Sequence, residues 1–372
     1  MRRLAMQPRP DWRERCEAVG FTFHSIDGRY WDESVAYEFT LAQVETLEAA
    51  SEDLHQRYLE ALDWVIAHEH FAPFALPEAA IEEAVRSWRR QDPSLYGRFD
   101  FSWDGSGQPK LLEYNADTPT GLLEASVVQW HWLNDLNPAA DQFNSLHEKL
   151  IARWRAIAPD GPVHFCAIDG HEEDTGNALY LQDTARQAGL QTRYLPIEFI
   201  GHHAGRGTFV DQYEQDIRHC FKLYPWEWLM QDDFGRHVER SGIRFVEPAW
   251  KLLLSSKAML PILWQLNPGH PNLLPASFRD DLPGAYVRKP LYAREGQNIR
   301  IVAADLRLES DGPHADAPCI YQAYAPLAEY AGSHAVLGCW MVGEQAAGLG
   351  IREDASPITR DSSRFVPHYF ID

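Results

Sequence analysis

The sequence predicts a mixed α/β protein with more than one subdomain, and three observations support this expectation. The chain has 372 residues, which is long for one simple hydrophobic core. Two runs of alternating side chains flank the turn segment DGSGQP, so 96–115 is predicted to form a β-hairpin. A strand, a helix and a second strand follow one another within 160–245, which is the order of an α/β unit.

The first part of the chain, 1–95, is expected to be mainly helical after an early turn or strand. Thr40 is placed to cap a long helix through 41–71, in which apolar residues recur at helical spacing. A second helix is predicted over 77–91, with a proline near its start and an Asp-Pro pair after its end.

The rest of the chain is expected to combine helices and strands. Two helices are predicted after the hairpin, over 120–136 and 141–158. Strands and loops are expected from 246 onward. Because no repeat or low-complexity linker appears, the parts are expected to pack closely. The sequence thus predicts four parts: 1–95, 96–150, 160–245 and 246–372.

Charge and cysteine content exclude several classes of function. The net charge of −20 argues against nucleic acid as a general partner, since a phosphate backbone needs a basic surface, and it is compatible with a cationic substrate such as a polyamine. The five cysteines are widely spaced and form no CxxC pair, so neither a disulfide framework nor a zinc site is predicted. No apolar segment has the length of a signal peptide core or a membrane span. We expect a cytoplasmic protein without a membrane partner.

The hairpin is the most informative segment for function. If it turns about the middle of DGSGQP, Asp100 lies opposite Glu113 and Arg98 lies opposite Asn115. Side chains alternate between the faces of a strand, so these four share one face. The apolar side chains of the same strands then face a core: Phe99, Phe101, Leu112 and Tyr114.

Two carboxylates directly across a sheet repel each other, so the pair at Asp100 and Glu113 requires compensation. A hard divalent cation such as Mg²⁺ provides it, because carboxylate and amide oxygens are its preferred ligands. The alternative is a surface hairpin in which Arg98 neutralises the acids.

Four further positions in the second half of the chain are candidates for phosphate or nucleotide contacts. Lys289 stands before a polar turn that contains Gly296, and a flexible turn with basic residues at its base suits a polyphosphate. Lys257 adjoins an apolar stretch, Gln322 ends a strand-like run, and Arg352 follows a glycine-flanked segment. Taken alone, the two lysines are better explained as solvated side chains, Gln322 is explained as well by an ordinary strand end, and the alternative for Arg352 is a surface ion pair. No dinucleotide, Walker, serine-hydrolase or zinc-protease motif is present.

Together these segments resemble the synthetase domain of the glutathionylspermidine synthase family, and most closely its stand-alone acid–amine ligases. The resemblance extends over nearly the whole chain and is carried by DPSLYGRFDF, LLEYNADTPT, FKLYPWEWL, EPAWKLLLSSKAMLPILW, HPNLLP, YVRKPLYAREGQNI and REDASPITRDSSRFVPHY. It implies an ATP-grasp fold that holds ATP between two α+β subdomains under a mobile lid. It also implies an ATP-dependent ligase that activates a carboxylate as an acyl phosphate and joins it to an amine. ADP and phosphate are then released.

The resemblance implies a role for each candidate residue. Asp100, Glu113 and Asn115 match magnesium ligands, and Arg98 with Asp100 matches a pair at the reacting phosphate. The positions that match nucleotide contacts are Arg98, Asp100, Lys257, Lys289, the lid residues Glu295 and Gly296, the adenine-hinge residue Gln322, and Arg352 of a closing loop. Those that match contacts to a thiol-peptide substrate are Thr118 and either Glu172 or Glu173.

The order of these motifs has a further implication. In most ATP-grasp proteins the phosphate lysines precede the metal acids, whereas here the acids come first, which implies a permuted connectivity. The amidase domain of the bifunctional members has no counterpart in this sequence, so amide hydrolysis is not expected. Thr118-Pro119-Thr120 replaces the small residues expected after the metal motif, which leaves the acid and amine open. A phosphotransferase and a nucleotide-binding module without catalysis are the alternatives.

Overall fold

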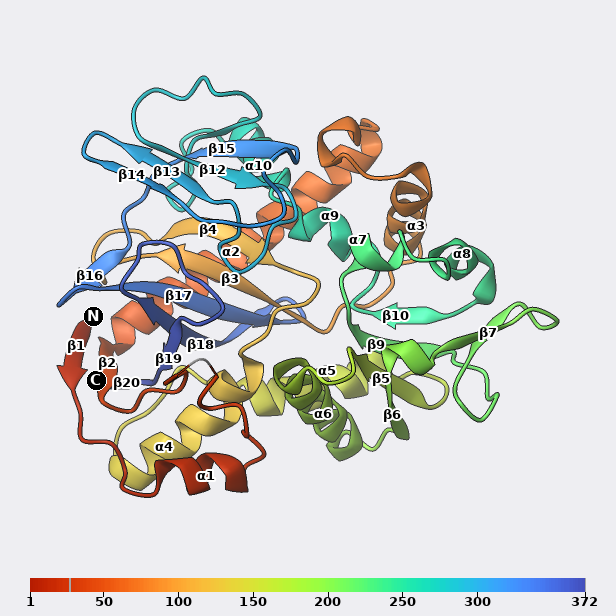
Figure 1. Cartoon of the computed structure of the whole chain (residues 1–372), viewed down its shortest axis with the longest axis horizontal. Coiled ribbons are helices and arrows are strands. Elements are labelled where there is room, and N and C mark those ends of the chain that lie inside the picture. The colour runs from red at the N-terminus through yellow and green to blue at the C-terminus, as the bar shows by residue number, and fades with distance from the viewer. Residues whose placement is uncertain (27, 372) are drawn as a thin grey trace.

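A computed structural model describes residues 1–26 and 28–371 of the chain. A six-stranded antiparallel sheet lies at the centre, in the order β19-β18-β17-β3-β4, with β16 also paired to β17 (Figure 1). Its strands are β3 (Tyr96–Ser102), β4 (Lys110–Asn115), β16 (Ala328–Tyr330), β17 (Ser333–Val342), β18 (Gln345–Asp354) and β19 (Arg364–Val366). The predicted hairpin β3–β4 is therefore continued by strands from the far end of the chain.

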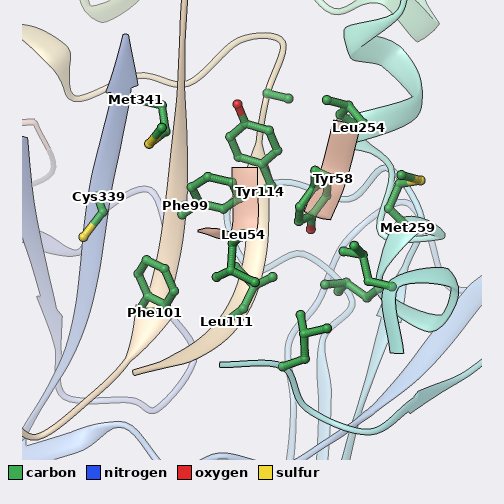
Figure 2. Packing of buried hydrophobic residues seen from close by; sticks show 14 of the residues in the cluster. Leu54, Tyr58, Phe99, Phe101, Leu111, Tyr114, Leu254, Met259, Cys339 and Met341 are labelled. Atoms are coloured by element: carbon green, nitrogen blue, oxygen red, sulfur yellow. The ribbon is translucent and has the colours of Figure 1, made fainter. Parts of the chain in front are cut away.

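A long helix covers one face of this sheet. Helix α2 (Leu41–Ala67) begins at Thr40, whose side chain and that of Gln43 form the reciprocal hydrogen bonds of a capping box. Its apolar stripe packs against β17 and β18 and against the helices α9 (Lys251–Ser255) and α10 (Met259–Leu266). Figure 2 shows this core, in which the rings of Phe99 and Tyr114 stack with centroids 3.9 Å apart.

A second antiparallel sheet lies beside the hairpin (Figure 1). In spatial order its strands are β11 (Ala276–Ser277), β15 (Cys319–Ala323), β12 (Tyr286–Pro290), β13 (Arg300–Ala303) and β14 (Leu306–Glu309). The connection between β12 and β13, residues 291–299, is called the lid loop below.

The predicted α/β unit is a four-stranded parallel sheet, called the parallel-sheet unit. In spatial order its strands are β10 (Arg244–Val246), β9 (His219–Leu223), β5 (Val163–Ala167) and β6 (Thr192–Pro196). Helix α6 (Glu172–Gln187) connects β5 to β6 as predicted, and Gly189 follows its end with φ of +94°. The remaining elements of this region are α5 (Leu146–Ile157), β7 (Gly201–His203), β8 (Thr208–Val210), α7 (Trp226–Leu229), α8 (Val238–Ser241) and 3₁₀ turns at Ile197–Phe199 and Gly235–His237.

Both ends of the described chain meet in a small three-stranded sheet. Its strands are β1 (Arg2–Ala5), β2 (Val35–Thr40) and β20 (His368–Ile371). The remaining helical elements are α1 (Trp12–Ala18), a 3₁₀ turn (Ala72–Phe74), α3 (Glu78–Arg89), a π-helix (Glu124–Val128) and α4 (Gln129–Leu136). In the part of the chain that the structure describes, no helix is long and apolar enough to cross a membrane.

The structure corrects several sequence-based boundaries, and α2 ends at Ala67 rather than at 71. Helix α5 begins at Leu146 rather than at 141, because 141–144 instead form bridges to β20 and β18. Residues 246–371, expected as strands and loops, also contain the helices α9 and α10, and the part beyond Arg352 contributes strands to two sheets. Strands β17 and β18 are buried on both faces, so their sequences lack the alternation that identifies a half-buried strand.

Candidate active site

The hairpin has the predicted register around its charged residues. Asp100 pairs with Glu113, and Arg98 pairs with Asn115. A bulge follows Asp100, so Phe101 lies opposite Leu111 instead of Leu112. The prediction that Leu112 faces the core is therefore wrong: Leu111 is fully buried there, and Leu112 lines a cavity. The bulge brings an apolar side chain and Glu113 to the same cavity.

Arg98 and Asp100 form a bidentate pair at the base of the hairpin face. Nε and Nη2 of Arg98 donate to the two carboxylate oxygens of Asp100 at 2.7 and 2.9 Å, and Nη1 donates to the carbonyl of Thr120 at 2.6 Å. Nδ2 of Asn115 donates to Asp100 at 3.1 Å and to Glu113 at 3.3 Å. Arg98 therefore neutralises one of the two acids and orders the segment that follows the hairpin.

Glu113 is paired with the first of the two lysines. Nζ of Lys257 lies 3.1 Å from Oε2 of Glu113 and donates to the carbonyl of Ala293 at 2.7 Å. Burial alone would raise the pKa of Glu113, but the charges of Lys257 and Lys289 outweigh it and hold this pKa well below its ordinary value. Glu113 therefore stays ionised at neutral pH.

Lys289 lies deeper, on β12. Its Nζ donates to Oε1 of Gln322 at 2.7 Å and to the carbonyl of Leu112 at 2.8 Å. Burial lowers its pKa to about 8, and the neighbouring charge of Lys257 acts in the same direction. Gln322, on the adjacent strand β15, donates in turn to the carbonyl of Leu111 at 3.0 Å. Hydrogen bonds thus tie the second sheet directly to the hairpin.

Two adjoining cavities meet at the carboxylate pair. The first is called the aliphatic cavity. It contains Lys257, Lys289 and Gln322, and its apolar walls include Leu112, Val287, Ile299, Ile301, Leu327, Val336 and Ile358. The second is called the polar cavity. Both are lined by Asp100, Glu113, Glu295, Gly296 and Thr359.

The polar cavity brings together segments that are distant in the sequence. Its lining includes Arg98, Asn115, Thr118, Thr120, His171, Asp174, Trp228, Arg294, Arg352, Arg360 and Asp361. From the start of α6 it contains His171 and Asp174 rather than Glu172, which is exposed, or Glu173, which is buried. Burial raises the pKa of Asp174 to about 6, and nearby acids including Glu173 add to this effect.

Arg352 contacts the C-terminal loop in addition to the cavity. Its Nε donates to the carbonyl of Ser363 at 2.9 Å, and Nη2 donates to the carbonyls of Arg360 and Asp361 at 2.9 and 2.7 Å. The loop that it holds packs against the lid loop at Gly296, where φ is +69° and an added Cβ would lie 2.5 Å from the carbonyl oxygen of Thr359. Only glycine suits that position, because a side chain would collide with the C-terminal loop. The lid loop and the C-terminal loop therefore touch beside the two cavities that Asp100 and Glu113 line.

Several residues of the site were not selected from the sequence. Arg294 lies within the predicted lid segment, and Arg360 lies in the tail motif, but neither was singled out. Asp117 and Lys222 form an ion pair of 2.9 Å behind the cavity with almost no exposed surface. The lone charge of Lys222 within the apolar strand β9 is the signal that identifies such a pair.

The donor set on the hairpin fits a magnesium ion. Asp100, Glu113 and Asn115 offer carboxylate and amide oxygens on one face, and Mg²⁺ usually takes only a few protein ligands. In the structure Nδ2 of Asn115 and Nζ of Lys257 point at the carboxylates and supply positive polarity there. The described residues contain no larger cluster of His, Cys, Asp or Glu that would hold a metal.

Comparison with known proteins identifies relatives over the whole chain. The model of the family described as glutathionylspermidine synthase preATP-grasp matches residues 3–371. A Haemophilus influenzae protein described as "Putative acid--amine ligase" is 40% identical over 393 residues, covering all of both chains. The trypanothione synthetase of Crithidia fasciculata is 29% identical, covering 95% of this chain and 57% of that protein. The bifunctional glutathionylspermidine synthetase/amidase of Escherichia coli is 28% identical, covering 89% of this chain and 58% of that protein.

The fold also has a solved counterpart. A glutathione synthetase-like effector from Globodera pallida superposes with a TM-score of 0.57 at 11% identity, covering 90% of this chain and 89% of the other. The mixed α/β arrangement of several sheets is consistent with a glutathione synthetase-like fold.

Proposed function

The chain belongs to the glutathionylspermidine synthase family, and from this premise we propose that it is an ATP-dependent carboxylate–amine ligase. The single observation that supports the proposal most is the position of Asp100 and Glu113. They lie between Lys257, Lys289 and Arg98 and line both the aliphatic and the polar cavity. A nucleotide in the first cavity and a carboxylate in the second would meet at this charged junction.

The aliphatic cavity is the proposed ATP site of an ATP-grasp fold with permuted connectivity. Its apolar walls suit a purine ring, Gln322 at its edge would hydrogen-bond it, and Lys257 and Lys289 would neutralise phosphates. The walls come from the hairpin of the 96–150 part and from the 246–372 part, while the 160–245 part faces the carboxylate substrate. The lid residues Glu295 and Gly296 close over the junction, and the mainly helical 1–95 part supports the hairpin from behind.

Asp100, Glu113 and Asn115 are the residues that would hold Mg²⁺, which when bound would neutralise the charge of nucleotide phosphates. The protein's own side chains would stabilise the other charges that develop during the reaction. Lys257, Lys289 and Arg352 would stabilise the charge of the transferring phosphoryl group. Arg98 would stabilise the acyl phosphate and the oxyanion that forms when the amine attacks.

The proposed reaction has two steps. A substrate carboxylate oxygen attacks the γ-phosphorus of ATP, which forms an acyl phosphate and releases ADP. The amine nitrogen then attacks the acyl carbon, loses a proton, and expels phosphate as the amide bond forms. Closure of the lid loop would exclude water, which otherwise hydrolyses the acyl phosphate.

The proposed substrates are a small-molecule acid, such as a thiol peptide, and an amine, such as a polyamine. The names of the relatives point to glutathione and spermidine chemistry. Thr118 lines the polar cavity, and Glu172 or Glu173 is the proposed second contact near it. The cavity also gathers the acids Asp174, Glu295 and Asp361, whose charge would attract a cationic amine.

Release of ADP tests this function directly. Wild-type protein with Mg²⁺ and ATP would be offered thiol peptides and amino acids, each with and without a polyamine. Release that requires both an acid and an amine, and that is lost in Glu113→Ala, is the expected result. Release that requires an acid but is indifferent to the amine would favour a phosphotransferase. ATP binding without release under any pair would favour a nucleotide-binding module.

A further inference from the structure

An ion pair outside the carboxylate cluster joins the parallel-sheet unit to the lid loop. Glu227, in the short helix α7, is buried, and its Oε1 lies 2.5 Å from Nη1 of Arg294 in the lid loop. The Arg294 guanidinium also lies 5.5 Å from the centre of the Trp228 ring, within the range of a cation–π contact. Two neighbouring residues of α7 therefore contact the same lid side chain.

Glu227 depends on Arg294 for compensation of its charge. Among the residues that the structure describes, neither of its carboxylate oxygens accepts a hydrogen bond. The cation nearest along the chain, Lys222, is already paired with Asp117 at 2.9 Å. A buried carboxylate that loses its partner is strongly unfavourable, so movement of Arg294 away from Glu227 carries a large electrostatic penalty.

Arg294 stands between two sides of the lid loop, one anchored to the hairpin side of the molecule and the other hydrogen-bonded to Ser310 and Asp311. On the anchored side, Lys257 donates to the carbonyl of Ala293 at 2.7 Å, and the hydroxyl of Tyr292 donates to the carbonyl of Phe74 at 2.9 Å. On the other side, Glu295 and Gly296 have φ values of +52° and +69°. The chain thus changes direction immediately after the residue that Glu227 holds.

We propose that Glu227 is a positioning residue, which holds Arg294 and thereby keeps the lid loop closed over the polar cavity. Closure of the lid then depends on the parallel-sheet unit, which forms the opposite wall of that cavity. This inference rests on the proposed function for its purpose, since a closed lid matters only when a reactive intermediate must be kept from water. The contact itself can be tested without turnover.

Hydrogen exchange of the lid loop tests the proposal. The amides of Gln297 and Ile299 are protected by bonds to the carbonyl of Arg294 and to the Ser310 hydroxyl. In Glu227→Gln, without ligands, we expect these amides to exchange at least about tenfold faster. Glu239→Gln is the matched control, because Glu239 forms an exposed ion pair with Arg86 on the same unit. Unchanged exchange in Glu227→Gln would overturn the proposal.

A double variant with the two charges swapped distinguishes a positioning role of Glu227 from general destabilisation of the fold. Glu227→Arg combined with Arg294→Glu restores opposite charges across the contact, and we expect it to recover at least part of the lid protection lost in Glu227→Gln. Faster exchange throughout β9 in Glu227→Gln would indicate general destabilisation and would also overturn the proposal.

The Michaelis constants of the two substrates provide a second readout. With glutathione and spermidine as probes, Glu227→Gln should raise the KM for the acid more than that for ATP. If the wild-type protein shows no turnover with any acid–amine pair of the ADP-release panel, the proposed function fails while the exchange experiment still decides the role of Glu227.

Discussion

The hairpin and the parallel-sheet unit face each other across the polar cavity, and their charges are arranged differently. On the hairpin side, Arg98 pairs with Asp100 and Lys257 pairs with Glu113, so the acids are matched within the protein. On the opposite wall, Asp174 lies among other acids and its pKa is raised to about 6, first by burial. The hairpin is thus balanced before any ligand binds, whereas on the opposite wall Asp174 has the imidazole of His171 at 3.4 Å, rather than a lysine or arginine, as its partner.

Buried charges that are paired within the protein and buried charges that lack a partner should therefore behave differently. A balanced cluster can be held rigid in the absence of substrate, because each ion has a partner at hydrogen-bond distance. An acid without a lysine or arginine partner gains more when a cation arrives. A fully matched pair joins the two sides: Asp117, just after the hairpin, pairs with Lys222 on β9 of the parallel-sheet unit. The four predictions below test whether pairing decides the response to mutation and to pH.

The largest effect is expected when one partner of the buried pair behind the cavity is removed. Lys222→Met leaves Asp117 buried without its cation, and we expect a loss of about 3–5 kcal/mol in the free energy of unfolding, measured in urea. Asp117→Asn combined with Lys222→Met removes both charges and should cost much less. Equal losses in the single and double variants would show that packing, rather than the pairing of charge, explains the effect.

The hairpin pair should respond in activity instead of stability. Glu113→Ala removes a half-buried acid whose partner Lys257 keeps a hydrogen bond to the carbonyl of Ala293. We expect the fold to be retained and kcat to fall roughly 10²–10³-fold, the scale for loss of one charge-stabilising group. The control is Glu329→Ala, an exposed glutamate on β16. Wild-type activity in Glu113→Ala would remove the hairpin from the proposed site.

Local patterns were sufficient to predict the hairpin side of this comparison. Alternation and the turn composition determine which residues of β3 and β4 share a face, and the observed pairing of Asp100 with Glu113 follows from them. The exception is Leu112, because a bulge depends on how the strand fits its neighbours and has no fixed sequence signal.

The opposite wall was predicted less well because tertiary packing assembles it. His171 and Asp174 lie at the start of α6, whereas Arg294 and Arg360 come from two separate loops, and no local period connects these three segments. The same limit applies to the central sheet, in which β17 joins β3 across more than two hundred residues. The resemblance matched Glu172 or Glu173 to a substrate contact, whereas the cavity lining contains His171 and Asp174 from this segment. Its nucleotide contacts stay a prediction.

A third prediction concerns an acid without a cationic partner. Glu124 is fully buried in the π-helix; it accepts a hydrogen bond from the hydroxyl of Tyr30 at 2.7 Å, and its second oxygen has no partner among the described residues. Burial raises its pKa to about 7, and Glu173 adds to the shift while Arg352 opposes it.

The pKa of Glu124 in the folded chain lies above its ordinary value of 4.5. The folded protein therefore holds a proton that the unfolded chain releases, and stability from this group is lost as pH rises from about 4.5 to about 7. We expect Glu124→Gln to be more stable than wild type at pH 8 by on the order of 2 kcal/mol, with little difference at pH 4. Urea unfolding at both pH values measures this, and an equal difference at both would contradict the assignment.

The smallest effect is expected at Lys289, whose pKa is lowered by burial and would rise again when a phosphate binds beside it. Its pKa is about 8, so the free protein begins to lose this positive charge within the working range of pH. Phosphates beside Nζ would favour the charged form, and ATP binding should therefore weaken as pH rises through about 8. We expect the Kd for ATP to increase roughly tenfold between pH 7 and pH 9, measured by calorimetry. Lys289→Arg should flatten this dependence, because arginine stays protonated over the whole range. A wild-type Kd that does not change with pH would mean that Lys289 lies apart from the nucleotide, and the aliphatic cavity would lose its main electrostatic argument as an ATP site.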